Sequence, residues 1–288
     1  MRQDGIESKL GLHPHAGPDK KRLRLTVAYC GTSWRGWQSL VGGQTIQDEL
    51  TDAVKKATRI ETAIHGSGRT DAGVHALAQV AHMDVPASVR MTHAAWIKAL
   101  NACLPNTIRV TRVEDAAPDF HARFDAIGKT YKYRIWRPEM LSPFESDRAW
   151  HVYGPLDIAA LRRCAALLVG THNFARLSAN RGDMWETERR ALPEKTTRTL
   201  QRVEVRELGD VVELEFEGNG FLYRMVRLIT GSLIQVARGR ASEAWFADLL
   251  ATHEGLQSNQ MAPAAGLYLV KVKYPHPGEQ DSPEIHKP

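Results

Sequence analysis

Cysteine is scarce in this chain, and long hydrophobic runs are missing. The 288 residues include three cysteines, Cys30, Cys103 and Cys164. An odd number without metal-ligand spacing argues against a disulfide framework and fits a reducing cytoplasm. No apolar run has the length needed to span a membrane, and the polar N-terminus carries no secretory signal. The sequence therefore predicts a cytoplasmic protein with no membrane partner.

The common signals for bound nucleotides, metals and hydrolytic triads are missing as well. There is no P-loop and no Ser-His-Asp order. The twelve histidines form no His-x-x-x-His zinc motif. We therefore expect neither a metal nor a nucleotide cofactor.

The composition is that of an ordinary globular protein with excess positive charge. Hydrophobic residues make up 43% of the chain and charged residues 25%, which is typical of soluble domains. The length suits one large domain or two of ordinary size. A net charge of +5 favours a polyanionic partner such as nucleic acid.

Strand and helix patterns alternate along the chain. Period-two alternation predicts strands at 22–29, 63–66, 76–85, 108–113, 129–136, 199–208, 211–217 and 268–272. Helical spacing predicts helices at 46–57, 92–103, 155–168, 221–236 and 242–250. Thr45 with Asp48 resembles a capping box, Pro155 suits a first helical turn, and Gly209-Asp210 predicts a hairpin turn.

This order of elements predicts an α+β fold with a boundary near residues 115–128. We expect an N-terminal α+β subdomain at 21–118 and a C-terminal α+β subdomain at 119–274. Residues 1–20 and 275–288 have the composition of disordered tails. The polar, aperiodic stretch 178–195 predicts a long functional or mobile loop.

Residues 65–76, His-Gly-Ser-Gly-Arg-Thr-Asp-Ala-Gly-Val-His-Ala, are the most informative stretch. Asp71 follows the cation Arg69 by two residues, and glycines surround the pair. Glycine permits sharp turns and close approach of another molecule, and a nearby cation favours the ionised carboxylate. An ionised aspartate on a loop can be a nucleophile or a base. The alternative is a surface turn with a weak exposed ion pair.

The segment Gly-Arg-Thr-Asp-Ala-Gly-Val-His-Ala at 68–76 resembles the catalytic motif of the tRNA pseudouridine synthase A family. Four further blocks resemble that family in the right order, at 28–38, 119–126, 219–231 and 266–270. Cys30 stands where the family usually has aspartate. The first block also carries Trp34 and Trp37, which are either core residues or platforms for stacked bases.

The resemblance assigns roles to particular residues. Asp71 takes the place of the essential aspartate, and Arg227 that of an arginine that reaches it; Arg69 and Arg227 would keep it ionised and oriented. Tyr131 would stack on the target uracil, although a core tyrosine is the alternative. The expected substrate-binding set is Tyr131, Leu267, His121 and Arg123, with Leu267 lining the uracil pocket and His121 making an RNA or structural contact. Arg224, on the same predicted helix as Arg227, would face phosphate or solvent.

The resemblance implies a tRNA pseudouridine synthase that isomerises uridine at positions 38, 39 and 40 of the anticodon stem-loop. It implies two ferredoxin-like, RNP-like α+β subdomains with antiparallel sheets, a central basic active-site cleft and a homodimer. Asp71 would attack C1′ of the ribose or C6 of the uracil. The alternatives are a basic RNA-binding protein without catalysis and a synthase acting on another RNA.

Overall fold

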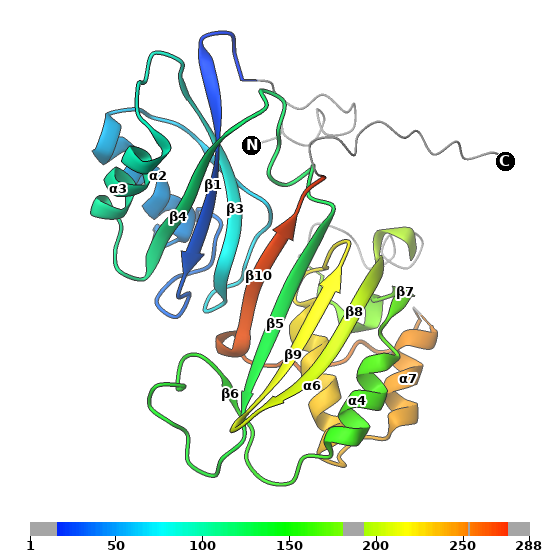
Figure 1. Cartoon of the computed structure of the whole chain (residues 1–288). Helices are drawn as coiled ribbons and strands as arrows, with labels where there is room; N and C mark the ends of the chain where they lie inside the picture. Colours follow the sequence, from blue (N-terminus) through cyan, green and yellow to red (C-terminus); the bar gives the residue numbers. More distant parts are fainter. Residues whose placement is uncertain (1–15, 181–192, 253, 276–288) are drawn as a thin grey trace, which may run out of the picture.

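One ten-stranded sheet runs through both halves of the molecule (Figure 1). The computed structural model describes residues 16–180, 193–252 and 254–275. The strand order is β4-β1-β3-β10-β5-β9-β8-β7, with β2 paired to β3 and β6 to β5. Most of the two predicted tails and most of the predicted 178–195 loop lie outside the described residues.

The N-terminal half has the order βαββαβ. Its elements are β1 (Lys20–Tyr29), α2 (Ile46–Thr58), β2 (Ile64–Gly66), β3 (His75–Pro86), α3 (His93–Cys103) and β4 (Ile108–Ala116). The strands lie side by side as β4-β1-β3-β2. Thr45 caps α2 by accepting a hydrogen bond from the Asp48 amide at 3.2 Å, as the sequence predicts.

The C-terminal half repeats this order with additions. Its elements are β5 (Gly128–Trp136), β6 (Trp150–His151), α4 (Ile158–Ala166), β7 (Gly170–Asn173), β8 (Thr197–Leu208), β9 (Val211–Gly218), α6 (Met225–Ala237), α7 (Glu243–Ala251) and β10 (Leu267–Lys273), with short 3-10 turns at Ala175–Leu177, Pro193–Lys195 and Ala264–Gly266. Its main strands lie in the order β10-β5-β9-β8. Both halves therefore have the ferredoxin-like arrangement, and the predicted α+β class is confirmed.

The two halves meet along one edge of β3. β2 pairs with this edge at residues 81–83, and β10 pairs in parallel with residues 75 and 76. In Figure 1, β10 lies between β3 and β5. The loop 67–74 leaves β2 and re-enters β3 where β10 replaces β2 as the neighbour. The stretch around Asp71 therefore lies at the joint of the two halves.

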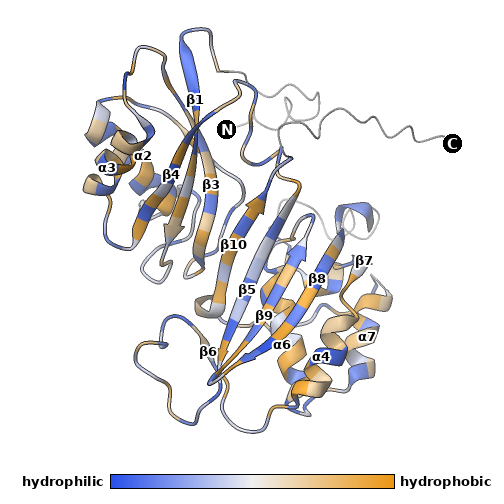
Figure 2. Cartoon of the chain, in the orientation of Figure 1, coloured by the Kyte–Doolittle hydropathy of each residue, from blue (hydrophilic) through white to orange (hydrophobic). Residues whose placement is uncertain are grey.

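Helices cover one face of each half and create two cores. In the N-terminal half, α2 and α3 pack on β1, β3 and β4 through residues such as Leu50 and Trp96. In the C-terminal half, α4, α6 and α7 pack on β5 and β9 through residues such as Leu161, Ile229 and Phe246. Figure 2 shows hydrophobic and hydrophilic bands alternating along β5, β9 and β8, as expected for strands with one covered face.

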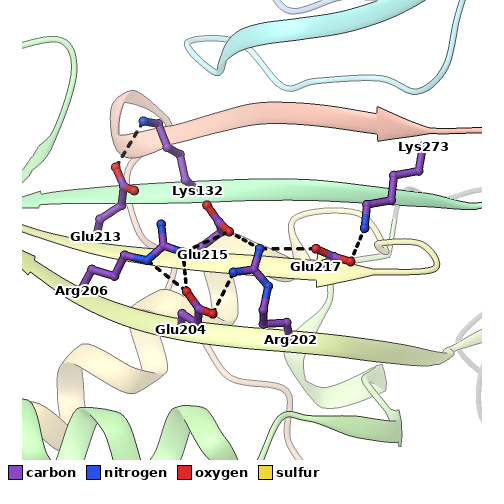
Figure 3. A network of polar contacts seen from close by, with 8 residues as sticks. All are labelled: Lys132, Arg202, Glu204, Arg206, Glu213, Glu215, Glu217 and Lys273. Atoms are coloured by element: carbon purple, nitrogen blue, oxygen red, sulfur yellow. Dashed lines mark hydrogen bonds and ion pairs between the residues drawn. The ribbon is translucent and has the colours of Figure 1, made fainter.

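The other face of the C-terminal half carries a network of ion pairs (Figure 3). Along β9, Val212, Leu214 and Phe216 are buried in the core, so the alternating glutamates 213, 215 and 217 lie on the opposite face. Their partners come from three neighbouring strands: Lys132 on β5, Arg202 and Arg206 on β8, and Lys273 on β10. Positive charge on this face is thus balanced by carboxylates.

Two predicted helix starts are wrong. α4 begins at Ile158 and not near Pro155, because the carboxylate of Asp157 caps it by accepting a hydrogen bond from the Ala160 amide at 2.9 Å. The predicted helix at 221–236 begins only at Met225, after Arg224 in the left-handed conformation with φ 59°. The short strands β6 and β7 were not predicted, because two to four residues give too little alternation to recognise.

Candidate active site

The loop that carries Asp71 is fixed at its start by a buried glutamine. Gln79, on β3, donates to the Gly68 carbonyl at 2.9 Å and accepts from the Ser67 hydroxyl at 2.6 Å. The Ser67 amide donates to the Val80 carbonyl at 2.8 Å, and Lys129 of β5 donates to the Ser67 carbonyl at 2.8 Å. Backbone polar groups of the loop are thus satisfied internally, which fixes the loop before any substrate binds.

The segment after β1 braces the same loop from the other side. The Trp37 amide donates to the Thr70 carbonyl at 3.1 Å, and the Tyr29 and Thr70 hydroxyls share a 2.8 Å hydrogen bond. Gly36 has φ +94°, and a Cβ there would lie 2.6 Å from the Thr70 oxygen. Only glycine fits this approach.

Trp37 is a core residue and not an exposed platform for RNA bases. Its side chain is 2% exposed and packs with the N-terminal core, so stacking on a base from solvent is excluded. Trp34 is half-buried, and its indole donates to the Thr107 hydroxyl at 3.2 Å. The core interpretation of this aromatic pair is therefore correct for Trp37.

Asp71 and Arg227 form an ion pair across the joint of the two halves. Arg227 Nη1 donates to Asp71 Oδ2 at 3.1 Å, and Arg227 Nε donates to the Ala262 carbonyl at 2.8 Å. The Arg227 side chain is 11% exposed and the Asp71 side chain is 23% exposed. Two fixed hydrogen bonds orient the guanidinium, so it holds the carboxylate in one position while part of the carboxylate stays open to solvent.

Arg69 lies apart from this pair. Its Nε donates to the Gln38 side chain at 3.2 Å, and the side chain is exposed. Within the described residues the ion pair of Asp71 is made by Arg227 and not by Arg69. Closeness in sequence therefore did not give contact, and the role of Arg69 remains a prediction.

His75 connects the two halves beside the loop. Its Nδ1 accepts from the Gly31 amide at 3.1 Å, so Nε2 carries the proton and donates to the Ala265 carbonyl at 3.0 Å. Its ring stacks on Tyr268 of β10 with centroids 4.6 Å apart. Burial lowers the pKa of His75, which favours the neutral ring that this bonding requires.

Tyr131 and Leu267 lie on neighbouring strands and on the same face. Tyr131 of β5 pairs in register with Leu269, and Leu267 pairs with Tyr133. The Tyr131 ring meets Phe221 edge-on with centroids 4.9 Å apart, and Tyr131 packs against both cores. Tyr131 is therefore partly a core tyrosine, and its stacking on a base, like the role of Leu267, remains a prediction.

A family model described as tRNA pseudouridine synthase matches residues 25–125 and 164–275. The chain belongs to the tRNA pseudouridine synthase family. Family membership makes it an isomerase that forms pseudouridine in tRNA.

Individual relatives match nearly the whole chain. A tRNA pseudouridine synthase A from Akkermansia muciniphila is 43% identical over 92% of this chain and 99% of its own length. Proteins of the same name from Solidesulfovibrio magneticus and Geobacillus kaustophilus are 42% and 39% identical, over 92% and 88% of this chain and 95% of each relative.

Two residues of the expected substrate-binding set lie in another part of this tRNA pseudouridine synthase. His121 is buried, and its Nδ1 accepts from the Arg123 and Phe124 amides at 3.1 and 3.3 Å. These bonds hold a turn, which supports a structural contact for His121. Arg123 is exposed, with its guanidinium 5.5 Å from the Phe124 ring centroid, so its contact with RNA remains a prediction.

Several residues that hold the synthase site were not found from the sequence. Gln79, Lys129 and His75 hold backbone carbonyls that lie 11, 62 and 190 residues away in the chain, respectively. The occurrence of His75 inside the motif was the one available signal.

Within the described residues of this synthase, no group of three or more His, Cys, Asp or Glu side chains is placed to hold a metal ion. In the same residues, no helix is long and apolar enough to cross a membrane.

Proposed function

We propose that this chain converts uridine to pseudouridine at positions 38, 39 and 40 of the tRNA anticodon stem-loop, with Asp71 as the nucleophile. The single observation that carries the proposal is the Asp71–Arg227 contact at 3.1 Å, in which two parts of the chain far apart in sequence deliver one oriented carboxylate. A purely RNA-binding protein has no need of such a pair.

The reaction rearranges atoms of the substrate without adding any. The N1–C1′ bond breaks, the uracil rotates, and a C5–C1′ bond forms; C5 then loses its proton and N1 gains one. Asp71 makes a covalent bond to C1′ or to C6 and is released at the end. The base must leave the helical stack to reach the loop.

Each neighbouring side chain has a distinct task. Arg227 holds the Asp71 carboxylate in position to attack the substrate carbon. Tyr131 presents a flat ring that holds a base without demanding particular hydrogen bonds, and Leu267 excludes water from the pocket. Arg69 and Arg123, whose side chains are exposed, contact RNA phosphates. We further propose a homodimer working in the cytoplasm, for which the three free cysteines are consistent with a reducing compartment.

Tritium release from tRNA labelled at uracil C5 tests the proposal, because formation of the C5–C1′ bond expels that proton. Asp71→Asn should abolish release while tRNA binding survives, since phosphate contacts supply most of the affinity. Asp71→Glu should also fail, because a carboxylate misplaced by roughly 1 Å costs about a hundredfold. Mapping of the modified positions identifies the target uridines. A folded, tRNA-binding Asp71→Asn protein that still releases tritium at the wild-type rate would refute the assignment.

A further inference from the structure

Two half-buried arginines beside the site, Arg198 and Arg224, have no carboxylate partner in the described part of the chain. Several comparable arginines elsewhere are paired with carboxylates, for example Arg22 with Asp84 at 2.7 Å and Arg134 with Glu145 at 2.9 Å. Arg109 and Arg238 are also half-buried without a carboxylate, and they donate to carbonyl or amide oxygens away from the site. Figure 3 shows the same rule for the arginines of the opposite sheet face. Leaving a partly buried cation without an anion is costly, so the presence of two such arginines next to the site requires a reason.

Arg224 makes no ion pair within the described residues that would explain its presence. It directly precedes α6 with φ 59° and ψ 8°, a conformation that is strained for any residue with a Cβ. A cation at this end of a helix is also electrostatically unfavourable. Its Nε is buried without a hydrogen-bond partner, and its guanidinium lies 4.8 Å from the centroid of the Tyr223 ring.

Arg198 lies at the start of β8, close to the chain segment that leads to Arg224. Its Nη1 donates to the carbonyls of Lys195 and Thr197 at 3.2 and 2.6 Å. A Cβ on Gly220 would lie 3.3 Å from Arg198 Nε, so the segment passes directly over the side chain. Burial lowers the pKa of Arg198, as expected for a cation that lacks an anion.

The segment between these arginines also reaches the reacting groups. Phe221 meets the ring of Tyr131 edge-on at 4.9 Å. One helical turn beyond Arg224, Arg227 bonds to Asp71 at 3.1 Å. The two cations therefore flank the stretch of chain that contacts both the stacking tyrosine and the partner of the nucleophile.

We propose that Arg198 and Arg224 bind backbone phosphates of the tRNA beside the uridine that enters the site. The inference rests on the proposed function, because it takes tRNA as the ligand. Guanidinium groups match phosphate oxygens in geometry and charge. A bound phosphate would therefore be the anionic partner that no carboxylate of the described residues provides. The cations on the opposite sheet face are less suited to binding phosphate, because they already form ion pairs with the glutamates of β9.

A pair of glycine substitutions separates a ligand role from a structural one. Arg224→Gly removes the guanidinium and relieves the left-handed backbone. Arg59→Gly is the matched control, since Arg59 ends α2 with φ 63° and is exposed. Neither variant should lower Tm, and Arg224→Gly should raise it by about 2 °C. Only Arg224→Gly should weaken binding of prefolded tRNA, by about tenfold near 0.1 M salt, with a logarithmic salt slope smaller by about one.

Arg198→Gln provides an independent second test, and it should lower affinity and salt slope in the same way. Equal tRNA binding by wild type, Arg224→Gly and Arg198→Gln would overturn the inference. A clear fall in Tm for Arg224→Gly, absent in Arg59→Gly, would also overturn it by showing a structural role. Because tRNA binding is measured without turnover, a failure of this inference can be distinguished from a failure of the proposed function. A wild-type chain that releases no tritium would reject the proposed function. Unchanged tRNA binding by the variants of an active enzyme would reject only this inference.

Discussion

Arg227→Lys keeps the positive charge at the site and should still cost most of the turnover. The guanidinium uses two different nitrogens, Nε for the Ala262 carbonyl at 2.8 Å and Nη1 for Asp71 at 3.1 Å. A lysine ammonium is a point donor on a flexible stem and cannot reproduce this fork. Losing one charge-assisted hydrogen bond costs about 1.5–3 kcal/mol, which corresponds to a rate about 10- to 150-fold lower if Asp71 is held only by that bond.

Single-turnover tritium release at saturating enzyme measures this loss without interference from product release. We expect the rate to fall in the order wild type, Arg227→Lys, Arg227→Gln, while the Kd for tRNA stays within about threefold because phosphates elsewhere dominate affinity. Folding should suffer little: the Asp71 side chain is 23% exposed, so water replaces its lost partner and the cost in free energy of unfolding is about 1 kcal/mol or less.

A melting curve for each variant controls for loss of structure. Arg227→Lys at the wild-type single-turnover rate would refute the reasoning that orientation of Asp71 depends on this fork. A defect confined to the Kd for tRNA would do the same, since it would make Arg227 a substrate-binding residue.

Other parts of the molecule give further expectations. Tyr131→Phe should keep much of the rate and Tyr131→Leu should lose more, if stacking is the main role; equal losses in tritium release would implicate the hydroxyl. Burial and two neighbouring histidines lower the pKa of His82 to about 3. The unfolded chain therefore binds a proton that the folded chain does not, and stability falls as pH drops below about 6.5; urea titrations at pH 7 and 5 should show a loss of up to about 2 kcal/mol from this group that is missing in His82→Gln. Gly36→Ala should lower both Tm and turnover, because its Cβ would meet the Thr70 oxygen at 2.6 Å, whereas Gly154→Ala, with φ +90° but nothing within 4 Å, should show only the backbone strain; equal effects would show that the close contact is unimportant. Chelator-treated, desalted protein should keep full activity on prefolded tRNA, and activity restored by one metal would contradict this.

The sequence predicts most helices and strands because their positions depend on nearby residues, through side-chain periodicity, helix caps and turn residues. The cap at Thr45 and the hairpin turn at Gly209, which has φ +60°, both lie where the sequence places them. The errors occur where a local rule competes with a neighbour. Pro155 suits a first turn, but Asp157 two residues later supplies a better cap, and Arg224 interrupts an otherwise continuous helical pattern.

The candidate site was predictable as a set of residues but not as a geometry. The motif indicates Asp71 and Arg227, yet their contact joins positions 156 residues apart. The periodicity of the sequence does not predict contacts between residues so far apart in the chain. For the same reason it does not predict that β10 pairs in parallel with β3. Arg69 shows the converse: although it is two residues from Asp71 in sequence, its side chain bonds to Gln38.

The location of the loop explains why both halves of the chain are needed for one carboxylate. Asp71 comes from the N-terminal half and its partner from α6, while His75 links the Gly31 amide to the Ala265 carbonyl across the same joint. The direct strand pairing there is short, two register pairs between β3 and β10. Leu269 and Val272 of β10 also pack into the N-terminal core, and side-chain bonds of Arg227, His75 and Lys129 cross the joint and help to align the two halves. Loosening the joint should therefore misplace the nucleophile before it unfolds either core, and a loss of turnover that precedes the loss of helical signal on heating is the expected sign of this order.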